Sequence, residues 1–322
     1  MTTSVAPPGD RAVIRCKDGN HTLELSDREI VAERLLKTSR KHTFDPDVDV
    51  DWDAEQDPDV FYMPPHTVSL YETAMWDGLS HRQQVELSKR EVASIASFGI
   101  WSEMLLMQIL VQHAYRNAYD SEHVAYALTE VADECRHSVM FGRMIKTFGL
   151  RATRMPAPEY HLAKLIGSIH VPLTMFAATL VIEEFTDALQ RVTFPDERIQ
   201  PLVRQVTRIH VIEEARHIKY AREELKRQVA KASATRRRVA ALALARAVSV
   251  MRTHIIHPSA YAGVGLDPKA AAKVALLSPH RQQTLAWTFR KCTAFFDEVG
   301  FLDGRAGKVW ARSGLLADRL TD

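Results

Sequence analysis

From Ser80 onward, apolar residues recur every three or four positions over most of the chain, which is the period of an amphipathic helix. No run of alternating apolar residues bounded by hairpin turns interrupts this pattern. Turn-forming residues such as Asp120, Gly149 and Pro195 divide it into segments. The pattern predicts helices over residues 80–118, 121–148, 157–192, 196–230, 235–255 and 280–298. The fold class that follows is all-α, with a helix bundle at its centre.

The first 64 residues lack this periodicity and are predicted to form an N-terminal arm. Residues 1–26 resemble loose chain. Ser26 with Glu29 resembles a capping box that begins a short helix ending near Lys41. The remaining residues, 65–322, form the predicted bundle domain with additional C-terminal helices.

An acidic segment follows this short helix, with Asp or Glu at every odd position of residues 45–59. A calcium loop would require glycine and glutamate where the chain has Trp52 and Pro58. We therefore predict an extended segment that wraps over the surface.

Composition narrows the class of protein. Of the 322 residues, 46% are hydrophobic and 25% charged, as in folded soluble proteins. The net charge is +2, and the basic run 219–238 has no aromatic residue after Tyr220, so we predict no nucleic-acid partner.

Three scattered cysteines exclude a disulfide scaffold. No secretory h-region is visible, and the apolar run 171–182 is shorter than the roughly 20 residues of a membrane span. We expect a cytoplasmic protein.

The candidate chemistry lies in two copies of one pattern, an acid followed by Glu-x-Arg-His. Of fourteen histidines, only His137 and His217 have a glutamate three residues earlier, and these are Glu134 and Glu214. Residues three apart share a helix face, so each carboxylate and imidazole can bind the same metal ion. Di-iron bundles use one such pair per iron and a further glutamate from each of two other helices.

Two isolated glutamates fit the missing positions. Glu103 is the only formally charged residue between positions 92 and 115, and a buried carboxylate requires a partner. Glu103 precedes Glu134 by 31 residues, and Glu183 precedes Glu214 by the same 31. The repeat selects Glu183, because Glu184 would point about 100° away.

A third histidine breaks the symmetry of the repeat. His210 lies four residues before Glu214, whereas Glu130 holds the equivalent position in the first half. Spacing alone leaves open whether His210 binds a metal or is a neutral buried histidine. The candidate metal ligands are Glu103, Glu134, His137, Glu183, His210, Glu214 and His217.

Other residues of the two pentads have two interpretations each. Asp133 and Glu213 could accept hydrogen bonds from ligand imidazoles or form surface ion pairs. Arg136 and Arg216 could neutralise the site or pair outward. Carboxylate and imidazole ligands without a thiolate favour iron, with manganese as the alternative. Apolar neighbours such as Trp101, Leu106, Met107, Phe176 and Leu180 could line a pocket, although core packing is the commoner role.

On these residues the chain resembles a ferritin-like di-iron oxygenase and is most similar to the p-aminobenzoate N-oxygenase family. The extra histidine, His210 in His210-x-x-x-Glu214-x-x-His217, is the most specific part of the resemblance. The resemblance covers roughly residues 65–225 and implies that His210 is a ligand. It further implies two iron ions per chain, O2 as co-substrate, a peroxo-diferric intermediate, oxidation of an amine to hydroxylamine, nitroso or nitro, and a homodimer.

Two other activities fit the same centre. One is hydroxylation or desaturation of a C–H substrate, and the other is iron binding or ferroxidation without an organic substrate. No Gly-rich dinucleotide motif follows a strand, so electrons are expected from an external reductase or chemical reductant.

Overall fold

The computed structural model describes residues 12–15, 22–161 and 171–316. The N-terminal elements are β1 (Ala12–Arg15), β2 (Thr22–Leu25) and α1 (Arg28–Lys41). The next are the 3-10 turn η1 (Pro65–Thr67) and α2 (Ala74–Asp77). The bundle helices are α3 (His81–Tyr115), α4 (Glu122–Thr147), α6 (Pro172–Thr193) and α7 (Pro201–Lys231). The C-terminal helices are α8 (Ala234–Met251), α9 (Ser259–Ala262), α10 (Pro268–Leu277), α11 (Pro279–Thr288), α12 (Arg290–Glu298) and α13 (Arg305–Arg312).

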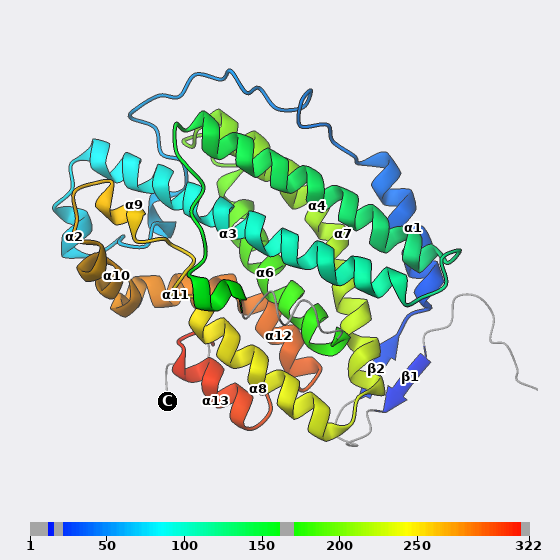
Figure 1. The fold of residues 1–322 in the computed structure, drawn as a ribbon. Coiled ribbons are helices and arrows are strands. Elements are labelled where there is room, and N and C mark those ends of the chain that lie inside the picture. The colour runs from blue at the N-terminus through cyan, green and yellow to red at the C-terminus, as the bar shows by residue number, and fades with distance from the viewer. Residues whose placement is uncertain (1–11, 16–21, 162–170, 317–322) are drawn as a thin grey trace, which may run out of the picture.

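Four long helices form the central bundle. α3 packs along α4, α6 packs along α7, and α1 lies against α4 and α7 (Figure 1). The predicted all-α class is confirmed, and the predicted bundle helices agree with the observed ones within a few residues. Of the helix predicted over 157–192, residues 157–161 are helical, residues 162–170 lie outside the described part, and α6 covers the remainder from Pro172 onward. The single helix predicted over 280–298 is wrong, because Phe289 separates α11 from α12.

Polar caps explain where the bundle helices begin. Ser80 and Gln83 form a reciprocal capping box at the start of α3, and the Ser121 hydroxyl caps α4. α6 and α7 each begin with a proline at the first helical position, Pro172 and Pro201, where no backbone N–H is needed.

The N-terminal arm is more ordered than predicted. β1 and β2 pair antiparallel from Ala12↔Leu25 to Arg15↔Thr22, so the expectation of loose chain is wrong for these residues. Each strand has only four residues, which is too short for the alternation of apolar and polar residues to stand out in the sequence.

The start of α1 also differs from its prediction. Asp27, not Ser26, is the N-cap, and its side chain accepts a hydrogen bond from the Ile30 N–H at 3.0 Å. Glu29 does not complete a capping box. Its carboxylate accepts instead from the backbone N–H of His123, at the start of α4, so a tertiary contact replaces the local one.

The acidic segment crosses the surface of the bundle as a series of turns. Trp52 anchors it as a mostly buried side chain with the Arg143 guanidinium 4.3 Å from its ring centroid. Arg143 also pairs with Asp47 at 2.6 Å, and the backbone N–H of Asp51 donates to Gln205 of α7. The segment lies over the surface as predicted, but it forms turns instead of the predicted extended chain, and one aromatic and one cationic contact hold it on α4.

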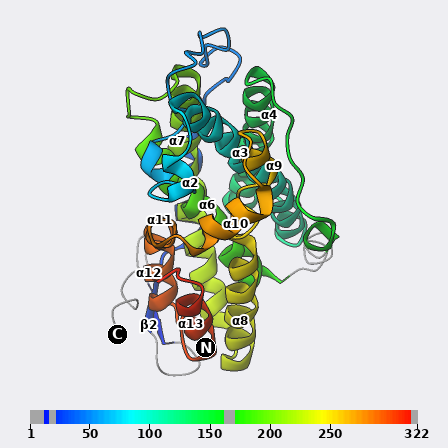
Figure 2. The same ribbon diagram turned by 90° about the vertical axis from the view of Figure 1, so that its left-hand side faces the viewer.

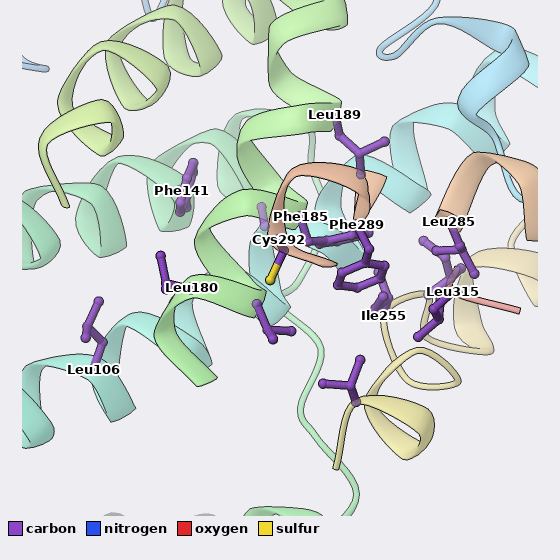
Figure 3. Close-up of a cluster of buried hydrophobic side chains, with 14 of the residues drawn as sticks. Leu106, Phe141, Leu180, Phe185, Leu189, Ile255, Leu285, Phe289, Cys292 and Leu315 are labelled. Carbon is purple, nitrogen blue, oxygen red and sulfur yellow. The ribbon is translucent and has the colours of Figure 1, made fainter. Parts of the chain in front are cut away.

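The C-terminal helices form a second layer beneath the bundle. Figure 2 shows α8 and α11–α13 gathered below α3, α4 and α7. α6 joins the two layers. Its Phe185 stacks on Phe289 with ring centroids 5.5 Å apart, beside the buried Cys292 (Figure 3). One face of α6 thus packs on the C-terminal layer, and the face that carries Glu183 is turned to the bundle.

The first half of the basic run is paired within the chain. Four of its side chains lie in ion pairs, namely Lys219–Glu223, Arg222–Glu184, Lys226–Glu298 and Arg227–Glu224. The exposed cations Lys231, Arg236 and Arg238 follow at the end of α7 and in α8.

One helix of the described residues, α3, is long and apolar enough to cross a membrane by length and composition. Its most apolar window is 56% buried inside the protein, and the helix packs along α4. The core helix of a bundle has these same properties.

Candidate metal centre

Buried carboxylates and imidazoles from all four bundle helices meet at the centre of the bundle. Two groups have ligand atoms within 4.8 Å of one another. The first group contains Glu134, His137, Glu214 and His217. The second contains Glu103, Glu134 and Glu183. Glu134 belongs to both groups, so its carboxylate connects them.

His210 lies beside both groups. Its Nε2 is 3.4 Å from Glu214 Oε1 and 3.7 Å from Glu103 Oε1. The structure therefore brings all seven residues selected from the sequence into one cluster, and none of them is more than 2% exposed.

Several atoms of this cluster have no hydrogen-bond partner although they are buried. They are Glu103 Oε2, Glu134 Oε1, Glu183 Oε2, Glu214 Oε2 and His210 Nε2. Unpartnered buried carboxylates are destabilising, and cations that they can bind remove the penalty. Oxygen and imidazole donors without a thiolate suit iron or manganese. The residues present therefore fit a di-metal centre.

Hydrogen bonds between helices fix which ring nitrogen each histidine turns to the cluster. His137 Nε2 lies 2.9 Å from Glu213 Oε2, so that nitrogen carries the proton, and Nδ1 faces Glu134. His217 has the same arrangement, with Nε2 3.2 Å from Asp133 and Nδ1 facing inward. Each acid thus accepts from the histidine of the opposite helix. Such partners orient ligand imidazoles in metal sites.

The two arginines of the pentads neutralise these outer acids. Arg216 donates to Asp133 at 3.1 Å and lies 3.7 Å from Glu213, and it is 4% exposed. Arg136 contacts Asp133 and lies 3.7 Å from Glu213. Burial opposes ionisation of Asp133, but the hydrogen bond from His217 and the two arginines hold its pKa at about 2. The four charged side chains form one closed network, so neither arginine pairs outward.

His210 is held in the opposite tautomer. Its Nδ1 lies 2.8 Å from Gln190 Oε1, which accepts the ring proton and leaves Nε2 as the inward-facing acceptor. The Phe141 ring packs on it with centroids 4.8 Å apart. Burial lowers the pKa of His210 to about 4, so the ring is neutral, as a metal ligand must be.

Two of the four inner carboxylates, Glu103 and Glu183, have a raised pKa, whereas His217 helps to lower the pKa of Glu134 and Glu214. Burial and the charges of Glu134 and Glu214 raise the pKa of Glu103 well above its usual range. Burial and the charges of Glu214 and Glu103 do the same for Glu183. Carboxylates that repel one another at this depth are typical of a site built for cations.

Two neighbouring glutamates lie outside the cluster. Glu184 is turned toward Arg222, to which it is bound at 2.5 Å, in agreement with the predicted difference in direction between Glu183 and Glu184. Glu130, the counterpart of His210 in the repeat, is buried near His217, and burial raises its pKa well above the usual range.

Gln190 was not selected from the sequence. It lies seven residues after Glu183, two turns along the same face of α6, and this spacing is the signal that could have identified it.

A second buried polar cluster also escaped the sequence. His113, His123 and Glu224 could hold a metal by distance, but the Arg28 guanidinium already lies among them. Arg28 donates to Glu224 at 2.7 and 2.9 Å and contacts His113 at 3.0 Å. The four residues come from four helices, and no local spacing predicts their contact.

A cavity of about 50 Å³ lies near His210, and none of the seven cluster residues lines it. Phe141 and Gln190 line it and also contact His210. None of the five apolar residues suggested from the sequence lines it. Leu106, Phe176 and Leu180 are instead buried in the core.

Relatives of similar length share the chain's sequence over most of its residues. Relatives 25% identical over 285 residues are the uncharacterized proteins Rv0885 of Mycobacterium tuberculosis and Mb0909 of Mycobacterium bovis, with 86% of this chain and 84% of each relative covered.

Among solved structures, an R2-like ligand-binding oxidase with an aerobically reconstituted metal cofactor superposes with a TM-score of 0.50 at 13% identity, covering 83% of this chain and 92% of that one. A variant of such an oxidase with a Mn/Fe cofactor gives 0.51 at 12% identity, covering 84% and 92%. At this identity the likeness concerns the ferritin-like fold.

The family model of p-aminobenzoate N-oxygenase AurF matches residues 25–300. The match spans most of the chain and includes every residue of the cluster. The chain therefore belongs to the AurF p-aminobenzoate N-oxygenase family and is a non-haem di-metal oxygenase.

Proposed function

We propose that this oxygenase oxidises the nitrogen of an amine. The balanced first step is R–NH2 + O2 + 2e⁻ + 2H⁺ → R–NHOH + H2O, with the two electrons supplied by an external reductase or chemical reductant. Further rounds would give nitroso and nitro products. The observation that carries the proposal is His210, whose neutral Nε2 faces Glu103 and Glu214 without a hydrogen-bond partner. This third histidine is the feature most specific to N-oxygenases in the resemblance.

The proposed ligands of two iron ions, or of manganese in place of iron, are Glu103, Glu134, His137, Glu183, His210, Glu214 and His217. Four carboxylates among them match the charge of two divalent cations, while the outer acids are already matched by Arg136 and Arg216. When bound, the metals would supply the reductive activation of O2.

The chain itself contributes geometry and exclusion of water. Asp133 and Glu213 hold the outer protons of His217 and His137, which keeps both Nδ1 atoms turned inward. Gln190 holds the Nδ1 proton of His210 and thereby presents Nε2. The bundle core around these groups is closed, so the reactive centre is protected from bulk solvent.

We further propose that the chain acts in the cytoplasm as a homodimer through an exposed apolar surface on α3 and α4. Side chains of this surface include Met104, Val111, Tyr115, Leu128 and Val139, which are 48–74% exposed. Apolar stripes of this kind are commonly covered by a partner chain. Those on α3 also contribute to the apolar composition of that helix.

A product analysis tests the proposed reaction. The metal-loaded chain is supplied with reductant, ¹⁸O2 and a panel of amines and hydrocarbons, and products are identified by mass spectrometry. We expect ¹⁸O on nitrogen. If oxygen enters only C–H bonds, the centre is a hydroxylase. If O2 is consumed with metal oxidation and no organic product, it is a ferroxidase. Either result rejects N-oxygenation.

The dimer is tested separately by measuring solution mass. The wild-type chain should have twice the 36.4 kDa of one chain, and Val139→Glu should shift it toward the monomer. An unchanged mass in both proteins at the value of a monomer would reject the proposed surface.

A further inference from the structure

We propose that the cavity beside His210 is the substrate pocket and that it selects an uncharged N–H compound, excluding amines that carry a carboxylate. The inference rests on the proposed N-oxygenation and adds the substrate class. It differs from what the family name suggests, since p-aminobenzoate is a carboxylate.

The position of the cavity connects it to the metal centre. Phe141 and Gln190 both line the cavity and contact the ring of His210. The ring centroids of Phe141 and His210 are 4.8 Å apart, and Gln190 Oε1 lies 2.8 Å from Nδ1, the ring nitrogen turned away from Glu103 and Glu214. A molecule in the cavity is therefore separated from the proposed ligand His210 by a single layer of side chains.

The lining carries no ionisable side chain among the described residues. Most of the lining surface is apolar, from residues such as Val92, Ile95 and Val203, and the polar side chains among the lining residues are Gln190 and three threonines. Burying a carboxylate without a cationic partner is strongly unfavourable. The lining therefore rejects an anionic substrate by desolvation alone.

The three threonines can only accept hydrogen bonds from a ligand. Each hydroxyl donates its proton to a carbonyl of its own helix: Thr186 to Ile182 and Glu183 at 3.1 Å, Thr193 to Leu189 at 2.8 Å, and Thr207 to Val203 at 2.7 Å. A hydroxyl that has donated its one proton presents lone pairs alone.

These lone pairs match N–H donors and repel carboxylate oxygens. The amide nitrogen of Gln190 is the one donor group among the described side chains of the lining. An uncharged amine also keeps the nitrogen lone pair that oxygen transfer requires, whereas an ammonium ion does not.

The size of the cavity favours a small molecule. Its volume of about 50 Å³ is below the roughly 150 Å³ of an apolar cavity that holds benzene. Met63 and Met144 line the cavity, and unbranched methionine side chains readily move to adapt its shape. A molecule with a single ring therefore enters only if these methionine side chains move, and anything larger than one ring with an amino group is excluded.

Binding measured without turnover tests the inference. Metal-loaded full-length protein is titrated anaerobically by calorimetry with aniline, toluene and 4-aminobenzoate, which share one ring and differ in N–H and carboxylate groups. We expect aniline to bind more tightly than toluene, and 4-aminobenzoate to bind at least tenfold more weakly than aniline.

Two pairs of variants locate the bound molecule. Gly99→Val adds atoms at the cavity wall, where a Cβ meets Phe141 at 3.5 Å, and should weaken aniline at least tenfold. Gly142→Val, where a Cβ meets nothing within 4 Å, is its control. Thr207→Val removes the lone pairs and should lower the aniline-to-toluene preference about fivefold, the loss of one hydrogen bond. Thr147→Val is its control, because that hydroxyl makes the same contact to its own helix outside the cavity.

Equal binding of aniline and 4-aminobenzoate would overturn the inference, as would aniline binding that neither Gly99→Val nor Thr207→Val alters. The proposed function fails in a different way. If aniline binds as expected and no amine is oxidised, N-oxygenation is wrong and the pocket stands. If a carboxylate-bearing amine is oxidised while aniline does not bind, the pocket is wrong and N-oxygenation stands.

Discussion

Two adjacent glutamates on α6 give the sharpest test of the metal centre. Glu183 and Glu184 are both buried, at 1% and 3% exposure, yet they face different partners. Glu183 has an unpartnered oxygen beside Glu103 and Glu134, whereas Glu184 binds Arg222. We expect Glu183→Ala to lose metal and Glu184→Ala to keep it.

The two variants should also differ in the stability of the metal-free protein: the variant that keeps the metal, Glu184→Ala, should be the less stable one. Removing Glu183 relieves carboxylate repulsion, so the free energy of unfolding should be unchanged or increase. Removing Glu184 leaves Arg222 without that carboxylate. Breaking a fully buried pair costs roughly 3–5 kcal/mol, and we expect about 1–3 kcal/mol here because the Arg222 side chain is 30% exposed.

The metal affinity follows from the ligand count. Loss of an outer partner of a ligand typically lowers metal affinity about 10–100-fold, and loss of a proposed ligand should lower it at least as much. Each tenfold step corresponds to about 1.4 kcal/mol. Anaerobic Fe(II) titration gives the affinity and stoichiometry, with two ions per chain expected for the wild type, and urea unfolding of the metal-free proteins gives the stability.

The combination of the two assays protects the test from misfolding. A Glu184→Ala protein that is less stable but binds two ions shows that stability and metal binding are separable. Equal metal retention by both variants would refute the assignment of Glu183 and the 31-residue repeat that selected it.

Three further predictions concern the surroundings of the centre. Asp133→Asn should lower metal affinity about 10–100-fold while two ions still bind at saturation, because Asp133 only orients His217; Fe(II) titration measures this, and an unchanged affinity would contradict it. Arg28→Ala should reduce the free energy of unfolding by about 2–3 kcal/mol, because the buried Glu224 then keeps only Arg227 as an arginine partner. Lys37→Ala is the control: the ion pair between Lys37 and Glu33 is exposed, so its loss should change the free energy of unfolding by less than about 0.5 kcal/mol. Burial and the charge of Arg28 lower the pKa of His123 from 6.5 to about 3 in the folded protein. Below pH 6.5 the unfolded chain therefore binds a proton on this histidine that the folded chain does not. The free energy of unfolding should fall as the pH falls below 6.5, by about 2 kcal/mol at pH 5. His123→Gln should remove that part of the pH dependence, and parallel stability–pH curves for the two proteins would disprove it.

Local spacing was sufficient to predict much of the centre. A helix places residues at i, i+3 and i+4 on one face, so spacing alone predicts that Glu134 shares a face with His137, and that His210 shares one with Glu214 and His217. The 31-residue repeat spans two helices, and it arises because the two helix pairs have the same length. It selected Glu183, which faces the cluster, over Glu184, which faces Arg222. Their role as ligands stays a prediction that metal binding will test.

Contacts between helices could not be predicted, because the order of residues does not specify which side chain of another helix a charged residue will contact. Asp133 and Glu213 resembled surface acids, yet each accepts from the histidine of the opposite helix. Arg28 lies 196 residues from Glu224 in the chain and is bound to it. Such pairs depend on the packing of α1, α4 and α7.

Helical periodicity and spacing are properties of short segments, so the order of residues predicts the all-α class, the bundle and the seven residues that converge. The tautomers of His137, His210 and His217, the neutralisation of Asp133 by Arg216 and the uncharged cavity beside Phe141 follow from the packing of the folded chain. These depend on distances of a few ångströms between helices, and the packing of side chains sets such distances in ways that no single segment encodes.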